Sequence, residues 1–488
     1  MKNTAIKIQN NFIYIITLLY IFFISKISFP LNFQQDDISE LKVANFQDFV
    51  CVLDQGDNHP IFSYSIWLIA KAFPENTEYI ISVFNIVISI VAIFALQKLI
   101  LKLSNQIISL LITSVFISSD TFLVYSVSLK QYSIEVLGCI IFVSILTESF
   151  EEGFNLFENY KLVLICFVLS ITSLPLLVLF SLILLFILYK RQLKFQSFYK
   201  FLVIFSPALL FIPRIISKIS RPTFRNYWSD FFIQTSSVAE FFSSSINIFN
   251  LMMDNYFGVF YIQKIGILYF LFFLYPLILK DWTSVRVFSL IGIFIIFNIG
   301  GFYPLGAGRT DLILFPLFLI LISRSFFFLN LNTLLIQISL IFFLVLSSTL
   351  VSPYYKIESM TPILKDVSRA INSQENLIIP MVEQKHPFEY YSKKMFGKIS
   401  EIEDTGCKIL KPNISNYLVF DPDYETVNSE LLEILSSGQY KDVYLIGIEL
   451  PGTEGVIREV ETLLVKSNYN FVSQNLYDVG MLLIRYSK

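Results

Sequence analysis

The chain has 488 residues, of which 55% are hydrophobic and only 15% are charged, with a formal net charge of −2. So few polar side chains cannot cover a soluble protein of this length, and the mean hydropathy of +0.65 therefore indicates a polytopic membrane protein. The nearly neutral charge and the lack of a basic tract give no support for a nucleic-acid partner, and the bilayer is the first partner expected.

Apolar segments of membrane-crossing length begin near the N terminus and continue to residue 351. A hydrocarbon core of about 30 Å requires about 20 helical residues, so about eleven transmembrane helices are expected. They cover residues 12–31, 79–97, 106–119, 133–147, 162–174, 175–189, 200–216, 262–279, 285–301, 311–323 and 331–351. The two segments within 162–189 could instead form one long tilted helix, because only Ser173 and Pro175 mark a turn between them.

Basic residues fall in alternate connections between these segments. They are Lys2, Lys7, Lys98, Lys102, Lys190, Arg191, Lys194, Lys200, Lys280, Arg286 and Arg324. Cytoplasmic connections are enriched in Lys and Arg, so we expect a multi-pass protein of the cell (plasma) membrane with a cytoplasmic N terminus. The first segment could also be a cleaved signal peptide, although residues 26–30 offer no small-residue cleavage site. Either way, the loops 32–78, 217–261 and 302–310 are expected on the outer face.

The tail has the composition of a soluble domain. Helical periodicity over 362–373, 429–437 and 454–467 alternates with strand-like runs at 377–382, 417–421, 443–448 and 481–486. This alternation is typical of a small α/β layer domain. We therefore expect an α-helical polytopic membrane domain over residues 1–351, with outer loops 32–78 and 217–261, and a C-terminal extracytoplasmic α/β domain over 352–488. Without a glycine-rich phosphate loop, the tail is expected to be a lid or docking module.

The four cysteines, Cys51, Cys139, Cys166 and Cys407, show no CxxC or Cys/His ligand spacing. The chain has only two histidines, so a dedicated zinc site is not expected. Cys139 and Cys166 lie in apolar runs and are expected to be small buried residues.

The first outer loop is rich in ionisable groups. These are Asp36, Asp37, Glu40, Asp48, Asp54, Asp57 and His59. Asp36 and Asp37 follow the first apolar segment, so we expect them close to the lipid surface. An acceptor hydroxyl or amine that attacks a sugar carbon needs a carboxylate to take its proton, and a partly desolvated aspartate has a raised pKa suited to this. A solvated extracellular loop carries the same residue types, so composition alone leaves both interpretations open.

The outer connections also supply candidate ligands for a phosphate leaving group. They are Lys130, Tyr132, Arg221, Arg225 and Arg309. Cationic and hydrogen-bonding side chains stabilise a phosphate as it departs. Lys130 and Arg309 lie at span ends, where basic residues also occur simply because their long stems reach the membrane surface.

Four stretches, taken in order, resemble motifs of the GT-C superfamily of integral-membrane glycosyltransferases, in particular the bacterial branch related to protein O-mannosyltransferases and aminoarabinose transferases. Asp36-Asp37 resembles the family's Asp-Glu pair, and DNHPIFSY at 57–64 resembles its D-x-H-P-P-L-Y-Y stretch. Lys130-Gln131-Tyr132 resembles an R-P-Y motif, and YPLGAGR at 303–309 resembles a Y-P-x-G-G-R turn. A softer match at 358–362 and 388–391 resembles the start of the family's outer α/β tail.

This resemblance implies inverting transfer of a sugar from a polyprenyl-phosphate donor to a glycan, lipid or protein acceptor on the outer face. Asp36 would be the general base, supported by Asp37, while Asp57 and His59 would shape the sugar and acceptor pocket.

The residues that the resemblance assigns to the lipid phosphate are Lys130, Tyr132 and Arg309. No cofactor is required by this scheme, and whether the acids of the first loop hold a divalent metal stays open. The alternative function is a lipid or glycan transporter or flippase without glycosyl transfer, for which inverted repeats and charges at mid-membrane would be expected.

Overall fold

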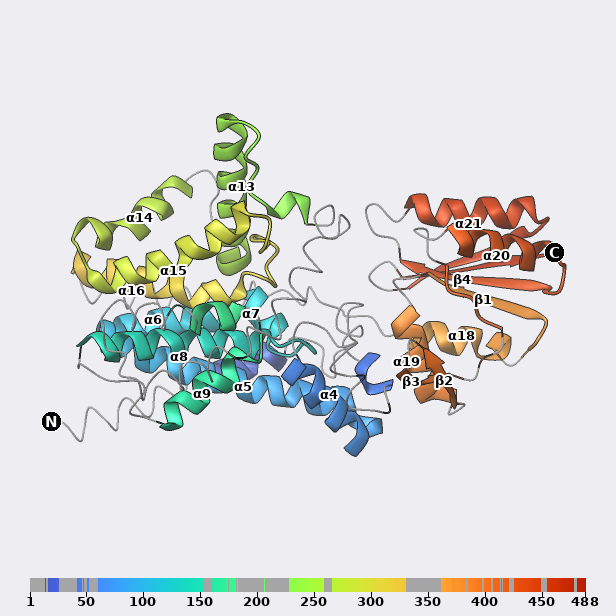
Figure 1. Ribbon diagram of the computed structural model, residues 1–488, viewed down its shortest axis with the longest axis horizontal. Helices are drawn as coiled ribbons and strands as arrows, with labels where there is room; N and C mark the ends of the chain where they lie inside the picture. The colour runs from blue at the N-terminus through green and yellow to red at the C-terminus, as the bar shows by residue number, and fades with distance from the viewer. Residues whose placement is uncertain are drawn as a thin grey trace. The chain divides into compact units, whose positions relative to one another are not determined.

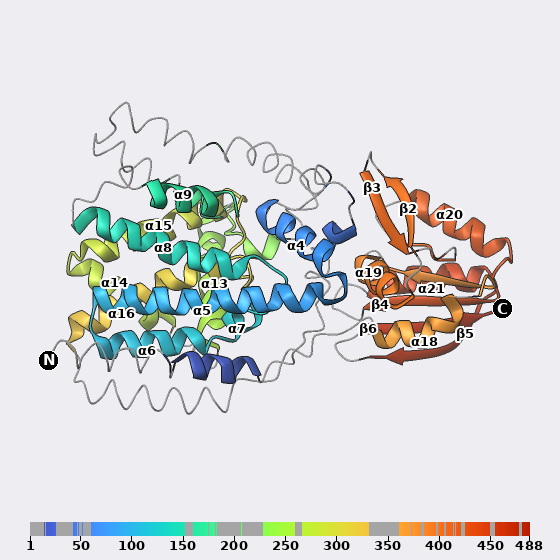
Figure 2. The same ribbon diagram turned by 90° about the horizontal axis from the view of Figure 1, so that it is seen from below.

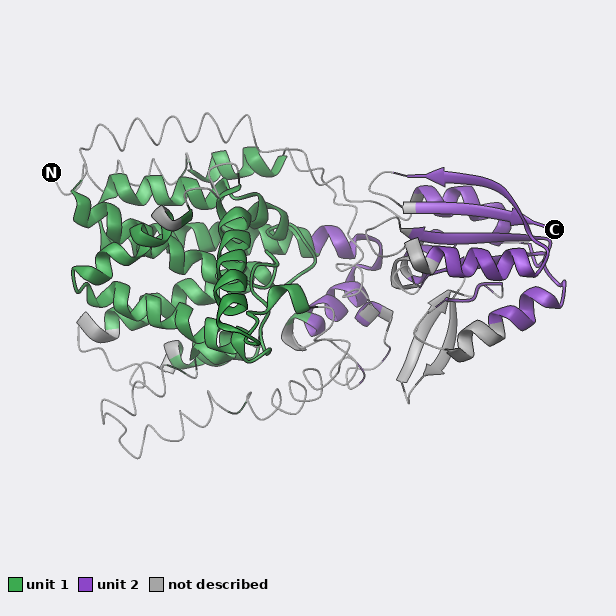
Figure 3. Ribbon diagram, turned by 90° about the horizontal axis from the view of Figure 1, so that it is seen from above, with its two compact units in different colours: residues 1–27, 58–62, 81–354 green, residues 28–57, 63–80, 355–488 purple. Residues whose placement is uncertain are grey.

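The computed structural model describes residues 16–25, 42–45, 60–151, 160–173, 175–180, 228–258, 266–330, 361–371, 373–381, 385–396, 399–404, 407–412, 416–420, 425–448, 454–477 and 481–488, with single residues 14, 47, 51, 182, 206 and 414. The chain divides into two compact units, coloured in Figure 3. Unit 1 comprises residues 1–27, 58–62 and 81–354, and unit 2 comprises residues 28–57, 63–80 and 355–488. The expected domain boundary at 351/352 and the span expected at 331–351 lie outside the described residues.

Unit 1 is a bundle of helices (Figure 1). Besides a helix at 16–25 and one from 175 to 180, the described helices are α5 (Thr77–Leu103, whose first turn belongs to unit 2), α6 (Gln106–Ile117), α7 (Asp120–Tyr125), α8 (Tyr132–Glu151), α9 (Tyr160–Ser170), α13 (Val238–Phe257), α14 (Gly266–Ile278), α15 (Trp282–Ile299) and α16 (Phe315–Leu329). Within the described residues, three helical segments are long and apolar enough to cross a membrane: Pro74–Leu103, Trp282–Ile299 and Leu312–Leu329. The expected helical membrane architecture is present, and the number of spans stays a prediction.

Polar side chains begin the helices where the apolar sequence is interrupted. The Asn105 side chain accepts a hydrogen bond from the backbone N–H of Ile108 at 3.0 Å and starts α6. The Ser237 side chain accepts one from Glu240 at 3.1 Å and starts α13. Ser173 likewise accepts from Leu176 at 3.4 Å. Each cap satisfies a backbone donor that the first helical turn leaves free. The chain therefore turns at Ser173, and the single tilted helix over 162–189 is not formed.

Helix α16 lies at the centre of the bundle. It contacts α6, α8, α14 and α15, and Figure 1 shows it between α15 and α6. Of its most apolar stretch, 67% is buried, against 39% for Pro74–Leu103 and 33% for Trp282–Ile299. The short 3₁₀ turn η7 (Leu312–Leu314) that precedes α16 contacts α8. The connection between α15 and α16 is therefore anchored to the interior of the bundle.

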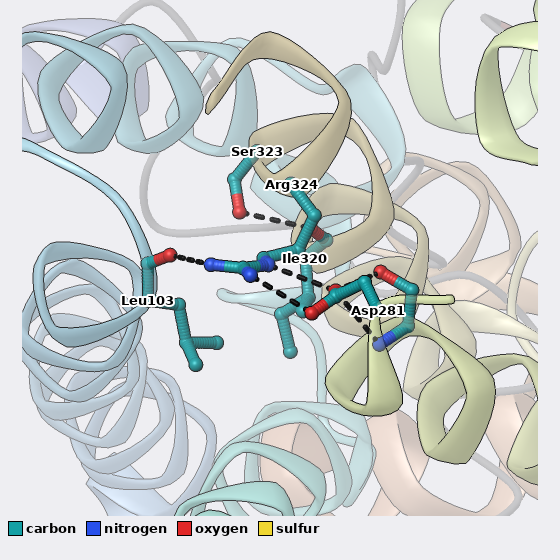
Figure 4. Close-up of polar contacts among 6 residues, drawn as sticks. Leu103, Asp281, Ile320, Ser323 and Arg324 are labelled. Carbon is teal, nitrogen blue, oxygen red and sulfur yellow. Dashed lines mark hydrogen bonds and ion pairs between the residues drawn. The ribbon is translucent and has the colours of Figure 1, made fainter. Parts of the chain in front are cut away.

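An ion pair joins three helices at the opposite end of α16 (Figure 4). Nη2 of Arg324 lies 2.8 Å from Oδ1 of Asp281, and its Nε donates to Oδ2 at 2.9 Å. The remaining Nη1 donates to the carbonyl of Leu103 at the end of α5. Asp281 also caps α15, because its carboxylate accepts from the backbone N–H of Ser284 at 3.1 Å. Bidentate geometry of this kind fixes orientation as well as charge.

Unit 2 contains a four-stranded mixed sheet in the order β1 (Asn376–Pro380), β4 (Asp442–Ile448), β6 (Met481–Ser487), β5 (Asn470–Leu476). Strands β1 and β4 are parallel, and the other neighbours are antiparallel. The helices of the unit are α4 (Pro60–Ala72, which begins in unit 1), α18 (Thr361–Ile371), α19 (Lys385–Phe396), α20 (Glu425–Ser436) and α21 (Glu454–Lys466). A separate hairpin pairs β2 (Ile399–Asp404) with β3 (Cys407–Pro412), and short 3₁₀ turns form η1 (Lys42–Asn45) and η2 (Pro74–Asn76).

Both faces of β1, at one edge of the sheet, are buried. Leu377 and Ile379 of β1 pack in one core with apolar residues of α20 and α21, whereas Ile378, between them, points to the other face and is fully buried. Figure 1 shows α18 on that other side of the sheet, and it contacts β1. Figure 2 gives a second view of these layers. No regular strand forms at 417–420 of the expected strand 417–421. This segment instead makes isolated parallel bridges, Tyr417 with Ile378 of β1 and Phe420 with Met381 just beyond it.

We predict that Arg324→Met lowers the free energy of unfolding by about 3 kcal/mol, because it leaves the half-buried carboxylate of Asp281 without its partner. Arg324→Lys keeps the charge but cannot form two parallel bonds, so an intermediate loss is expected. Thermal unfolding in detergent, followed by tryptophan fluorescence, gives the unfolding midpoints of wild type and both variants. Equal midpoints for wild type and Arg324→Met would contradict the structural role of the pair.

The same pair predicts a pH dependence. Burial alone would raise the pKa of Asp281, but the hydrogen bonds from Arg324 and Ser284 outweigh it and lower the pKa below the ordinary value of 3.8. The stability contributed by a carboxylate with a lowered pKa is complete above its unfolded pKa and is lost as pH falls through the folded one. The unfolding midpoints of wild type and Arg324→Met should therefore differ by a constant amount near neutral pH and converge below pH 3.8.

Candidate functional site

Two turns of unit 1 carry the described members of the predicted site. Lys130 and Tyr132 lie where the connection after α7 enters α8, and Arg309 lies in the connection between α15 and α16. Helix α13 links the two turns, because it contacts α7 and its Asn255 side chain donates to the carbonyl of Gly306 at 2.8 Å. The Thr121 hydroxyl of α7 donates in turn to the carbonyl of Asn255 at 2.6 Å.

The turn before α8 is held by side chains of α5. Nδ2 of Asn85, which is fully buried, donates to the carbonyl of Lys130 at 3.1 Å and also to that of Ser128. The hydroxyls of Ser89 and Ser133 lie 2.9 Å apart. These bonds satisfy backbone groups that would otherwise be buried without partners. They fix the backbone that carries Lys130, whose side chain is only 9% exposed.

Tyr132 begins α8 and packs against the preceding helix. Its ring meets that of Tyr125 edge to face, with 4.9 Å between the ring centroids and 69° between the planes. Such edge-to-face pairs add to the stabilisation from burial alone. The ring of Tyr132 is therefore locked in position next to Lys130 rather than free to swing.

Asn298, near the end of α15, organises the second turn. Its Oδ1 accepts from the backbone N–H of Ile233 at 2.8 Å, and its Nδ2 donates to the carbonyls of Phe231 and Tyr303 at 2.7 and 2.9 Å. The backbone N–H of Leu305 donates to the Phe231 carbonyl at 3.1 Å. One buried amide thus ties the turn to the segment that precedes α13.

Two glycines allow this turn to close. Gly306 and Gly308 have φ angles of +88° and +75°, in the region that residues with a Cβ rarely adopt. A Cβ on Gly306 would also lie 3.0 Å from Cβ of Leu251, which is closer than normal packing allows. The glycines of the YPLGAGR motif therefore have a steric explanation in the turn that presents Arg309.

Arg309 lies over an aromatic ring of the segment that precedes α13. The Cζ atom of its guanidinium is 5.0 Å from the centroid of the Trp228 ring, which is within cation–π range. Burial lowers the pKa of Arg309, but a guanidinium stays protonated at neutral pH. A positive charge that has lost part of its hydration interacts strongly with an anion, so this position suits a phosphate ligand.

Two buried acids that we did not predict as site residues, Glu135 and Asp311, adjoin these turns. Glu135 is 2% exposed and Asp311 is fully buried. Within the described part of the chain, no group donates a hydrogen bond of normal geometry to the Asp311 carboxylate, while its backbone carbonyl accepts from the Tyr256 hydroxyl at 2.6 Å. The pKa of Tyr303 is raised, first by burial and then by the charges of Glu135 and Asp311. The Tyr303 hydroxyl donates to the carbonyl of Thr310, next to Asp311, and η7 contacts α8, the helix that carries Glu135.

The sequence does contain a signal for these two acids. Asp311 follows the YPLGAGR motif by two residues, and Glu135 lies one helical turn after Tyr132. Ionisable residues at the edge of an apolar span are uncommon and mark functional or structural sites. Both acids lie within expected spans, Glu135 in 133–147 and Asp311 in 311–323.

The remaining predicted residues cannot be placed. Asp36, Asp37, Asp57 and His59 lie outside the described residues, as do Arg221 and Arg225. The role of each of these residues stays a prediction.

We predict that Gly306→Ala destabilises the protein by about 1–2 kcal/mol, because alanine at this positive φ is strained and its Cβ would be crowded by Leu251. Gly292→Ala in α15 is the matched control, since nothing lies within 4 Å of a Cβ added there. Thermal unfolding of the two variants in detergent should show a lower midpoint for Gly306→Ala and a midpoint equal to or above that of wild type for Gly292→Ala, because alanine is favoured over glycine inside a helix. If both variants unfold like wild type, the turn does not depend on this glycine.

Comparison with known proteins gives matches only to solved structures. No protein-family model matches the sequence, and no curated protein matches it. The crystal structure of ArnT from Cupriavidus metallidurans bound to undecaprenyl phosphate matches with a TM-score of 0.52 and 10% identity, over 97% of each chain. The same protein in its apo state matches with a TM-score of 0.54 and 10% identity, over 99% of this chain and 98% of that one.

A third structure is the oligosaccharyltransferase of Archaeoglobus fulgidus in complex with zinc and sulfate. It matches with a TM-score of 0.53 and 9% identity, over 98% of this chain and 73% of that one. At such low identity the likeness concerns the fold. It nevertheless extends over nearly the whole chain, so the chain shares the fold of ArnT and of this oligosaccharyltransferase.

Proposed function

We propose that the protein is a glycosyltransferase that moves a sugar from a polyprenyl-phosphate donor to a cell-surface acceptor on the outer face of the membrane. The observation that carries this proposal is the match over 97% of both chains to ArnT, which was crystallised with undecaprenyl phosphate. A fold by itself hosts several activities, so the chemistry of the two turns must support the assignment.

The two turns offer the chemistry that a lipid phosphate needs. Lys130 is nearly buried and Arg309 lies over an indole ring, so both cations are partly removed from water. Both precede helices of the bundle, α8 and α16, and so lie at helix ends, where the headgroup of a membrane lipid would be placed. Charge-assisted hydrogen bonds to phosphate oxygens are about twice as strong as neutral ones. The Tyr132 hydroxyl would add a donor beside Lys130.

In the proposed reaction, Asp36 takes the proton of the acceptor hydroxyl or amine. The acceptor atom then bonds to the anomeric carbon while the bond from that carbon to the phosphate oxygen breaks. Attack on the face opposite the leaving group inverts the anomeric configuration. Polyprenyl phosphate departs with the bonding electron pair, and Lys130 and Arg309 stabilise its added negative charge.

The supporting roles of the first-loop residues are those that the resemblance to the GT-C superfamily implies. Asp37 would orient Asp36, and Asp57 with His59 would line the sugar and acceptor pocket. Glu135 and Asp311 are more deeply buried than Lys130 and Tyr132, so we give them no direct contact with the substrate.

The direct test is transfer from labelled polyprenyl-phosphate sugars by the reconstituted protein, with a membrane extract as acceptor. We expect wild type to release polyprenyl phosphate and Asp36→Asn to be slower by about 10²–10⁴-fold, the usual contribution of a general base. Equal rates would show that Asp36 is not the base. If wild type releases polyprenyl phosphate from none of the donors, the enzyme assignment itself is wrong.

A second prediction concerns the phosphate ligand. Arg309→Gln should raise KM for the donor by about 10–100-fold, the effect of losing a hydrogen bond to a charged group. The KM of Arg309→Lys should lie between those of wild type and Arg309→Gln, because an ammonium keeps the charge but lacks the planar fork. Steady-state kinetics gives KM for the three proteins, and Arg286→Gln in α15 is the control for the loss of one positive charge. An unchanged KM in Arg309→Gln would remove Arg309 from the donor site.

A further inference from the structure

The pairing of the four cysteines carries an inference independent of the proposed activity. Cys51 is disulfide-bonded in the structure and 6% exposed. Cys139 and Cys166 are free and buried. The chain contains one other cysteine, Cys407. We propose that Cys51 and Cys407 form a disulfide that fastens the first outer loop to the C-terminal α/β domain.

The packing of unit 2 supports this pairing. The turn η1 contacts both α19 and β3, and β3 begins at Cys407. Val43 and Ala44 of η1 are buried, so the contact is close. Cys51 follows η1 by six residues, a length that reaches at most about 21 Å when fully extended. The first loop and the tail also fall in one compact unit, which contains residues 28–57 and 355–488.

The bridge has a consequence for topology. Two cysteines can pair only if they face the same compartment, and disulfides persist in oxidising ones outside the cytoplasm. The loop that contains Cys51 and the strand that Cys407 begins are then both extracytoplasmic. This agrees with the orientation expected from the basic residues and rests on a different property of the chain. Cys139 in α8 and Cys166 in α9 are buried and stay reduced.

The bridge also suggests a role for the C-terminal domain. Cys51 lies between the Asp36-Asp37 pair and the Asp57-His59 stretch along the loop. A covalent link at this point restricts the loop strongly, because it removes much of its conformational freedom. The domain would thus act as an anchor for the loop, which refines the expectation of a lid or docking module.

Formation of the bridge requires an oxidant. The two thiols lose two protons and two electrons, and the sulfur–sulfur bond forms by thiolate attack through a mixed disulfide. The electron acceptor is the disulfide of an extracytoplasmic thiol oxidoreductase, which leaves as a dithiol. In a purified system, oxidised glutathione serves the same purpose.

The test counts free thiols in the full-length protein after denaturation in SDS, using a maleimide that carries a polyethylene glycol chain. Without reduction we expect two adducts, on Cys139 and Cys166, and with a phosphine reductant we expect four. Peptide mapping of the unreduced protein should give one linked pair of peptides, containing Cys51 and Cys407.

Variants make the assignment specific. Cys51→Ser and Cys407→Ser should each give three adducts, both with and without reductant. The control Cys139→Ser should give one adduct without reductant and three with it. Four adducts on unreduced wild type would overturn the proposal, as would a linked peptide pair that joins other cysteines or two chains. No activity is measured, so the outcome is independent of whether the protein transfers sugar.

Discussion

The structure depends on one constraint: backbone polar groups buried in a membrane protein must find partners within the protein. Between apolar helices the chain has to turn, and each turn exposes carbonyl and amide groups. Asn85, Asn255 and Asn298 supply these partners for the two turns that carry Lys130 and Arg309. The positions of the candidate phosphate ligands therefore depend on side-chain amides, two of which, Asn85 and Asn255, are remote in sequence from the turns that they hold.

The same constraint makes the two ends of the bundle different. At one end, Arg324 is saturated by the Asp281 carboxylate and the Leu103 carbonyl, so its charge serves to join helices. At the other end, Arg309 rests on the Trp228 ring in a glycine turn that leaves its backbone close to neighbouring helices. Arg309, in the connection before α16, and Arg324, within α16, thus have different surroundings.

Much of the bundle could be predicted from segment length alone. Helices α5, α6, α8 and α15 lie where apolar runs of sufficient length predict them. Helix α13 was missed inside the loop 217–261, because it is rich in serine and asparagine and leaves Val238, Phe242 and Ile246 exposed. Strand β5 was missed because all its residues are exposed, so no alternation of apolar and polar positions marks it.

Less of the candidate site could be predicted from the sequence. Short motifs predict Lys130 and Arg309. Glu135 and Asp311 are recognised as neighbours of the site only in the folded structure, where both influence Tyr303. The pairing of Cys51 follows no local spacing, because its remaining partner lies far along the chain. Contacts between remote segments set both features, and a single sequence does not show them.

The central claim is that the Lys130 and Arg309 turns bind the phosphate of a polyprenyl lipid. Native mass spectrometry of the full-length protein, titrated with undecaprenyl phosphate in detergent, measures this without requiring the sugar or the acceptor to be known. The account predicts a bound lipid on wild type and on Arg286→Gln, and at least tenfold weaker binding to Lys130→Gln and Arg309→Gln. Equal binding by all four proteins would contradict it.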